Sequence, residues 1–249
     1  MFEHVQLRPR SHAEAGDLGL MLCRHHWPEM LSLCGVLMLP IVALAWLAAQ
    51  LDPALALVVF WWLKPTLDRP MLHLLSRRTA GMQTSVRQTL AEVGQWWRGG
   101  HLASLMLYRW HPERSVLLPV WQLEGLRGRA RRQRSQILGH GGGSAGIGLS
   151  TMTSLFELTI MLGLGMLAFW LLPSALLPGE VDWLALESGL LPPEWWGWLA
   201  GLYALSILII EPFYLSAGFG LYLNQRCRLE CWDLEPPLRQ LAARSGGSA

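Results

Sequence analysis

Four long apolar runs constrain this chain more than any other feature of its sequence. They cover residues 30–49, 53–75, 151–172 and 198–223. Each approaches or exceeds the roughly 20 residues that an α-helix needs to cross a hydrocarbon core about 30 Å thick. Hydrophobic residues make up 52% of the chain and charged residues only 15%, a balance that favours lipid over water as the solvent. The sequence therefore predicts an all-α membrane protein, a four-span helical bundle.

The spacing of the runs predicts how the bundle is organised. Residues 50–52 are too short a connection for anything but a helical hairpin between the first two spans. We divide the chain into a cytoplasmic interfacial helix (1–29), a first transmembrane hairpin (30–75), a basic cytoplasmic loop with amphipathic helices (76–150), a second transmembrane hairpin (151–223) with an acidic periplasmic loop (173–197), and a cytoplasmic tail (224–249).

The distribution of charge predicts the orientation. Arginine is concentrated in residues 76–150 and occurs at both ends of the chain, whereas residues 173–197 contain acidic residues and neither Lys nor Arg. Basic residues flanking spans remain on the cytoplasmic side. We expect a multi-pass protein of the bacterial inner membrane with both termini in the cytoplasm. A signal peptide is not favoured, because the first run begins about 29 residues in and is too long for an h-region.

Two segments outside the spans are amphipathic. Ser11 and Glu14 form the capping box S-x-x-E before a helix that places Leu18, Met21 and Leu22 on one side. A second apolar face recurs at helical spacing, at Val86, Leu90, Val93 and Trp97. Both segments suit helices that lie in the membrane interface, and both suit helices that pack on the spans of the same chain. The two alternatives stay open.

Charges and prolines interrupt the second and fourth spans. Lys64 is the only lysine of the chain and lies near the predicted bilayer midplane, followed directly by Pro65. Proline removes a backbone donor and disfavours a helical conformation in the residue before it, so a helix break is expected. Glu211 and Pro212 repeat the device in the fourth span, and Pro70 is a further expected break. We infer two hairpins in pseudo-repeat.

The buried charges should pair with one another. The predicted cluster contains Lys64, Asp68, Arg69, Glu157 and Glu211. A charge at the centre of a bilayer costs at least about 2.5–3.5 kcal/mol when it is unpaired, so Lys64 is expected to meet Glu157 or Glu211. Such a cluster can act as a packing lock, as a hydrated pathway or substrate pocket, or in proton coupling.

A basic run and a glycine-rich run precede the third span. Five arginines are expected to contact lipid headgroups: Arg127, Arg129, Arg131, Arg132 and Arg134. A nucleic acid or an acidic protein is a less favoured partner for this run. Residues 139–148 match G-x-G-x-x-G, but no strand precedes them, so we interpret them as a flexible linker.

No pattern in the chain indicates an enzyme. There is no catalytic triad spacing, zinc-protease motif or paired-carboxylate constellation. The four cysteines lie at or near the reducing cytoplasmic side, where structural disulfides are not expected. We therefore expect no catalytic activity, no metal and no cofactor.

The C-terminal region resembles a known group of proteins. Residues 212–242 are similar to the end of bacterial membrane proteins related to the membrane domain of glycerophosphodiester phosphodiesterases, and residues 61–77 and 118–134 to an uncharacterised inner-membrane branch of that group. The resemblance rests on a tail motif at Leu221, Tyr222, Arg226, Glu230, Trp232 and Asp233. Cys231 and the pair Pro236–Pro237 depart from the group's pattern.

The resemblance implies a role without catalysis of its own, because phosphodiesterase activity in that group belongs to a separate soluble domain. The uncharacterised branch is associated with MoxR-type AAA+ ATPases and von Willebrand-type proteins. The expectation is a membrane scaffold or accessory subunit of a membrane-bound assembly, in contact with lipids and protein partners and not with nucleic acid. The alternative is a transporter or lipid-handling protein that uses the charge cluster.

Overall fold

A computed structural model describes residues 8–97, 111, 113–126, 128–173, 177–178 and 192–230. Within these ranges the chain forms helices and contains no strand. Three helical segments are long and apolar enough to cross a membrane: α2 (Trp27–Ala49), residues 144–171 of α9 (Gly128–Leu171), and α11 (Pro193–Glu230). In its described part the protein is thus all-helical, with three membrane-length helices.

The first helix packs on the chain's own long helix. α1 (His12–His25) begins at Ser11 with the predicted capping box, which is confirmed. Its buried face contains Ala15, Gly19, Leu22 and Cys23, while Met21 is exposed, so the predicted apolar side packs on the same chain only in part. α1 lies against α11, and a Cβ built on Gly19 would come within 2.1 Å of the backbone oxygen of Ser216. Glycine is required at Gly19 because the two backbones approach so closely.

The second predicted span is divided at Lys64. α3 (Ala54–Leu63) ends directly before it and α4 (Pro65–Thr79) begins directly after it, so the interruption expected at Pro65 is present. The expected non-helical backbone at Lys64 was wrong: its φ is −45° and its ψ −45°, and its N–H still donates to the Phe60 carbonyl at 3.0 Å. The carbonyl of Leu63 accepts a hydrogen bond from the Thr66 hydroxyl at 2.5 Å. Pro70, in contrast, lies inside α4 and does not end it. Almost every residue between Pro65 and Leu75 is buried, so packing from all sides holds this helix through the second proline.

The second amphipathic segment forms two short helices instead of one. α5 (Val86–Ala91) and α6 (Val93–Trp97) meet at Glu92. The Glu92 carboxylate is bound by His73 and Arg77 of α4. These contacts place the segment against the protein at the end of α4.

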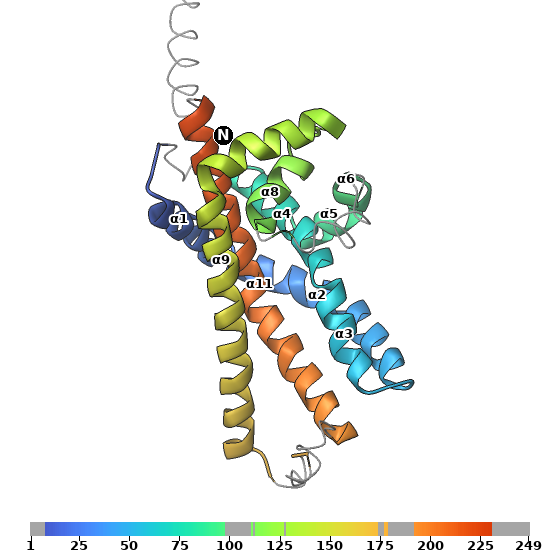
Figure 1. Ribbon diagram of the computed structural model, residues 1–249. Helices are drawn as coiled ribbons and strands as arrows, with labels where there is room; N and C mark the ends of the chain where they lie inside the picture. Colours follow the sequence, from blue (N-terminus) through green and yellow to red (C-terminus); the bar gives the residue numbers. More distant parts are fainter. Residues whose placement is uncertain are drawn as a thin grey trace, which may run out of the picture.

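The glycine-rich run lies inside a helix, so its interpretation as a flexible linker was wrong. α9 is continuous from Gly128 to Leu171, and Figure 1 shows it bending before it descends beside α11. α8 (Arg114–Gln122) packs against α9. A Cβ on Gly146 would lie 3.2 Å from the Glu113 side chain and 3.3 Å from that of Val116. Small residues let α8 lie close to α9, and this contact offsets the low helix propensity of glycine.

α11 is the central helix of the fold. It packs against α1, α2, α3, α4, α8 and α9, and Figure 1 shows it between α9 on one side and the α2–α3 hairpin on the other. Pro212 lies within the helix without ending it, contrary to the expected break. The Ser216 hydroxyl donates to the Pro212 carbonyl at 2.7 Å, and both residues are buried. Neighbours on every side keep α11 continuous where an isolated helix would tend to break.

Candidate functional site

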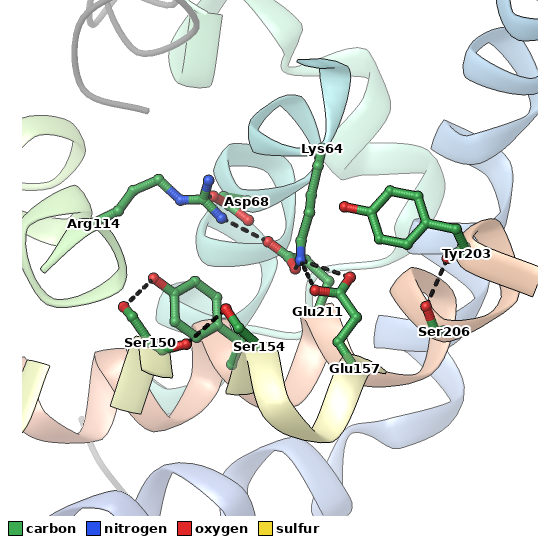
Figure 2. A network of polar contacts seen from close by, with 10 residues as sticks. Lys64, Asp68, Arg114, Ser150, Ser154, Glu157, Tyr203, Ser206 and Glu211 are labelled. Carbon is green, nitrogen blue, oxygen red and sulfur yellow. Dashed lines mark hydrogen bonds and ion pairs between the residues drawn. The ribbon is translucent and has the colours of Figure 1, made fainter. Parts of the chain in front are cut away.

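Lys64 lies at the centre of a buried cluster of charged side chains. Its Nζ is 2.7 Å from Glu157 Oε2 on α9 and 3.0 Å from Glu211 Oε2 on α11. Figure 2 shows the lysine side chain extended between the two carboxylates. The interruption at Pro65 puts Lys64 at the junction of α3 and α4, where its side chain reaches two other helices.

Arg114 is the second cation of the cluster. Its Nε is 3.1 Å from Asp68 Oδ2 and its Nη2 is 2.9 Å from Glu211 Oε1. Its guanidinium carbon also lies 5.5 Å from the centre of the Tyr214 ring. Sequence reasoning counted Arg114 only among the loop arginines. The sequence signal for its burial was the largely apolar run that follows it, residues 115–121. A helix with such a run is expected to be buried, and Arg114 is its first residue.

The cluster is deeply buried and carries more acids than bases. The side chains of Glu211 and Asp68 are 0% and 2% exposed, and those of Lys64, Arg114 and Glu157 are 11–12% exposed. With every group ionised, two positive charges face three negative ones. Arg69 is also buried and interacts electrostatically with Asp68. Removing one partner from such an arrangement leaves an uncompensated charge in a medium of low dielectric constant.

A polar pocket reaches the cluster from one side. It has a volume of about 290 Å³ and is lined by residues of α3, α8, α9 and α11, with His111 before α8. On α9 the lining residues are Ser150, Thr153, Ser154 and Glu157, which share one helix face at spacings of three and four. Ser150 and the Tyr214 hydroxyl are hydrogen-bonded at 3.0 Å. Figure 2 shows Tyr203 on the opposite side of Lys64 from Ser150 and Ser154.

A second ionic cluster joins the start of α9 to the end of α11. Arg134, predicted to contact lipid, is instead bound to Glu124, with Nε 2.7 Å from Oε2, and to Glu230. Arg226 pairs with Glu230 at 2.7 Å, and the Tyr222 hydroxyl donates to Glu124 at 3.1 Å. Of the predicted tail motif, Glu230 contacts Arg134 of the basic run, while Tyr222 and Arg226 join the same cluster through Glu124 and Glu230.

The remaining residues of these two predictions are placed as follows. Leu221 is buried, Arg131 is half-buried, and Arg129 and Arg132 are exposed. Arg127, Trp232 and Asp233 lie outside the described residues.

A third ionic contact lies outside the apolar spans, at Glu92. Hydrogen bonds from Arg77 and then His73 hold the pKa of Glu92 below its ordinary value. This contact ties the junction of α5 and α6 to the last turns of α4.

The cysteines and acidic residues do not assemble a metal site in the part of the chain that the structure describes. Cys23, Cys34 and Cys227 are buried, and Cys231 lies beyond the described residues. Burial raises the pKa of Cys23 to about 11, so this thiol stays protonated at neutral pH.

Fold and site together define a class: an all-helical protein with membrane-length helices arranged around a buried cluster of ionic side chains. No protein-family model matches the chain, and no curated protein or solved structure matches it.

Proposed function

We propose that this protein is a non-enzymatic scaffold or accessory subunit of an assembly in the bacterial inner membrane. In this proposal α2, α3 with α4, the apolar part of α9, and α11 are four spans in two hairpins, with both termini cytoplasmic. The proposal follows the arginine distribution along the chain and the packing of α2 against α3 and of α9 against α11.

One observation carries the proposal. Lys64 and Arg114 bind three carboxylates that come from α4, α9 and α11, so α8 and both proposed hairpins meet in one ionic cluster. We propose that this cluster fixes which helices pack together and in which register, since a wrong pairing would leave a charge unpaired. A bundle locked in this way presents a constant surface to a partner.

The resemblance to the uncharacterised inner-membrane branch suggests the kind of partner. We propose protein partners that include a MoxR-type AAA+ ATPase system, together with the surrounding membrane lipids. In this proposal the partner binds on the cytoplasmic side, where the second ionic cluster, Arg134–Glu124–Glu230, holds the start of α9 to the end of α11.

The test is affinity purification in mild detergent through a small tag, with mass spectrometry of the proteins that co-purify in stoichiometric amount. We expect a defined partner to bind the wild type and to be lost from Lys64→Ala. Arg87→Ala is the matched control, because Arg87 is an exposed cation of α5 outside both clusters. A wild-type protein that purifies without any partner would contradict the scaffold proposal.

The polar pocket favours a second candidate function, a transporter or lipid-handling protein. Lys64 and Glu157 line the pocket, and ionisable residues inside a membrane commonly mark substrate or ion pathways. Flux or lipid-transfer assays in liposomes test this candidate. Loss of transfer in Lys64→Ala and in Glu211→Gln, with retention in Arg87→Ala, would support it.

A further inference from the structure

The polar pocket is lined by residues of α3 and α9, together with residues of α8 and α11. α3 and α9 both pack on α11, and the Lys64–Glu157 pair joins the α3–α4 junction to α9. Apolar side chains face outward beside the pocket: Val58 and Trp61 on α3 are 50% and 37% exposed, and Met152 and Phe156 on α9 are each 60% exposed. A polar pocket therefore opens between two walls that suit acyl chains.

A line of hydroxyl groups leads into this opening. Ser150, Thr153 and Ser154 follow one face of α9 down to Glu157. Seven residues of helix cover about 10 Å. Hydroxyls can donate to or accept from a polar group along this path, and so replace the water that the group loses on leaving the membrane surface.

The charges that line the pocket select the chemical class of the ligand. Lys64, Arg114 and Glu157 are its ionic lining residues besides His111, while Asp68 and Glu211 lie behind them with almost no exposed side-chain surface. Lys64 and Glu157 pair with each other at 2.7 Å, and a zwitterion that carries a phosphate next to an ammonium group can replace this pair with one opposite charge for each of them. The aromatic rings of Trp61, Tyr203 and Tyr214 also line the pocket and add a favourable environment for the ammonium.

We propose that the pocket between α3 and α9 binds the headgroup of a zwitterionic, primary-ammonium phospholipid of the phosphatidylethanolamine type, which enters laterally from the bilayer. The phosphate lies towards Lys64 and Arg114, the ammonium towards Glu157, and the acyl chains lie against the outward faces of α3 and α9. The volume of about 290 Å³ is near the lower end of the range for small-molecule sites. This inference deepens the second candidate function, on which it rests, and is independent of the scaffold proposal.

The experiment is native mass spectrometry of the full chain in nanodiscs of equal phosphatidylethanolamine and phosphatidylglycerol. The wild type should retain phosphatidylethanolamine in preference to phosphatidylglycerol. Thr153→Leu should lower that retention by at least about fivefold, because it removes a hydroxyl from the lining and fills part of the pocket. Thr159→Leu is the matched control: the same change on the same helix, at an exposed position that does not line the pocket.

A second variant keeps the proposal testable if Thr153→Leu misfolds. Tyr214→Phe removes one pocket hydroxyl and its bond to Ser150 while it preserves the ring, and it should also lower retention. Equal retention of the two lipids by the wild type, or unchanged retention in both variants, would overturn the proposal. So would competition by soluble phosphoethanolamine as strong as that by the lipid, since the free zwitterion would then be the ligand.

The experiments distinguish failure of the headgroup site from failure of the second candidate function. Loss of selective lipid retention in a protein that still transfers lipid in liposomes would refute the headgroup site and leave the second candidate function intact. Absence of transfer by a protein that selectively retains phosphatidylethanolamine would refute that function and leave a structural lipid site.

Discussion

At the scale of single residues, Lys64 links the junction of α3 and α4 to α9 and α11. Its ammonium group is held by two carboxylates, and Glu211 is itself shared with Arg114. The ion pairs are therefore coupled, because Lys64 and Arg114 share the Glu211 carboxylate. Substitutions in the cluster should therefore show strongly non-additive effects on stability.

Replacement of Lys64 by methionine should destabilise the protein by about 3–5 kcal/mol, the cost of leaving a buried charge without its partner. Reversible unfolding in detergent micelles measures the change in the free energy of unfolding. Arg87→Met is the control and should have almost no effect, since Arg87 is exposed. An unchanged free energy of unfolding in Lys64→Met would contradict a role of the charge cluster in fixing the helix packing.

Glu92 gives the pH dependence. The pKa of its carboxyl is lowered in the folded protein by hydrogen bonds from Arg77 and His73. Its contribution to stability is therefore fully present above the unfolded pKa of about 4.3 and is lost as the pH falls through the lower folded pKa. The melting temperature of Glu92→Gln should lie below that of the wild type at neutral pH, and the two should converge in acid. A difference that persists unchanged to about pH 3 would contradict this.

At the scale of elements, close helix contacts depend on glycine. Gly19 of α1 and Gly220 of α11 lie at the crossing of the two helices, where a Cβ on either would come within 2.2 Å of the other helix's backbone. Backbone atoms cannot turn aside as a flexible side chain does. The close crossing of α1 and α11 therefore requires glycine at both positions.

Gly19→Ala should destabilise the protein by about 1–3 kcal/mol through overpacking. Gly16→Ala on the same helix is the matched control: a Cβ there meets nothing within 4 Å. It should be neutral or stabilising, since alanine is the better helix former by about 1 kcal/mol. Unfolding midpoints of the two variants compare the positions directly, and equal midpoints would contradict the close crossing.

The elements also show where sequence reasoning reaches its limit. The interruption at Lys64 and the need of that lysine for a glutamate follow from local chemistry, because proline lacks a donor and a buried charge needs a partner. The role of Arg114 does not follow, since its acids lie 46 residues before it and 97 after it. The glycine-rich stretch of α9 misled the prediction because its low helix propensity is a local property, whereas its packing against α8 is tertiary.

At the scale of the whole molecule, the proposed topology has a direct test. Asp52 lies exposed in the α2–α3 connection and Arg87 lies exposed on α5, on opposite sides of the membrane in the proposed arrangement. With Cys231 changed to Ser, Asp52→Cys should react with a membrane-impermeant maleimide in intact spheroplasts. Arg87→Cys should react only after permeabilisation, and labelling of both in intact spheroplasts would contradict four spans. The other three cysteines are buried.

The long helices differ in burial, and we expect them to differ in how many substitutions they tolerate. Within its apolar window α9 is only 6% buried, whereas α11 is 44% buried and touches six other helices. In a library of all single substitutions, the outer face of α9 should accept almost any apolar side chain, while α11 should tolerate very few. α9 and α11, two of the three membrane-length helices and alike in hydropathy, would then differ sharply in how much information their sequences carry.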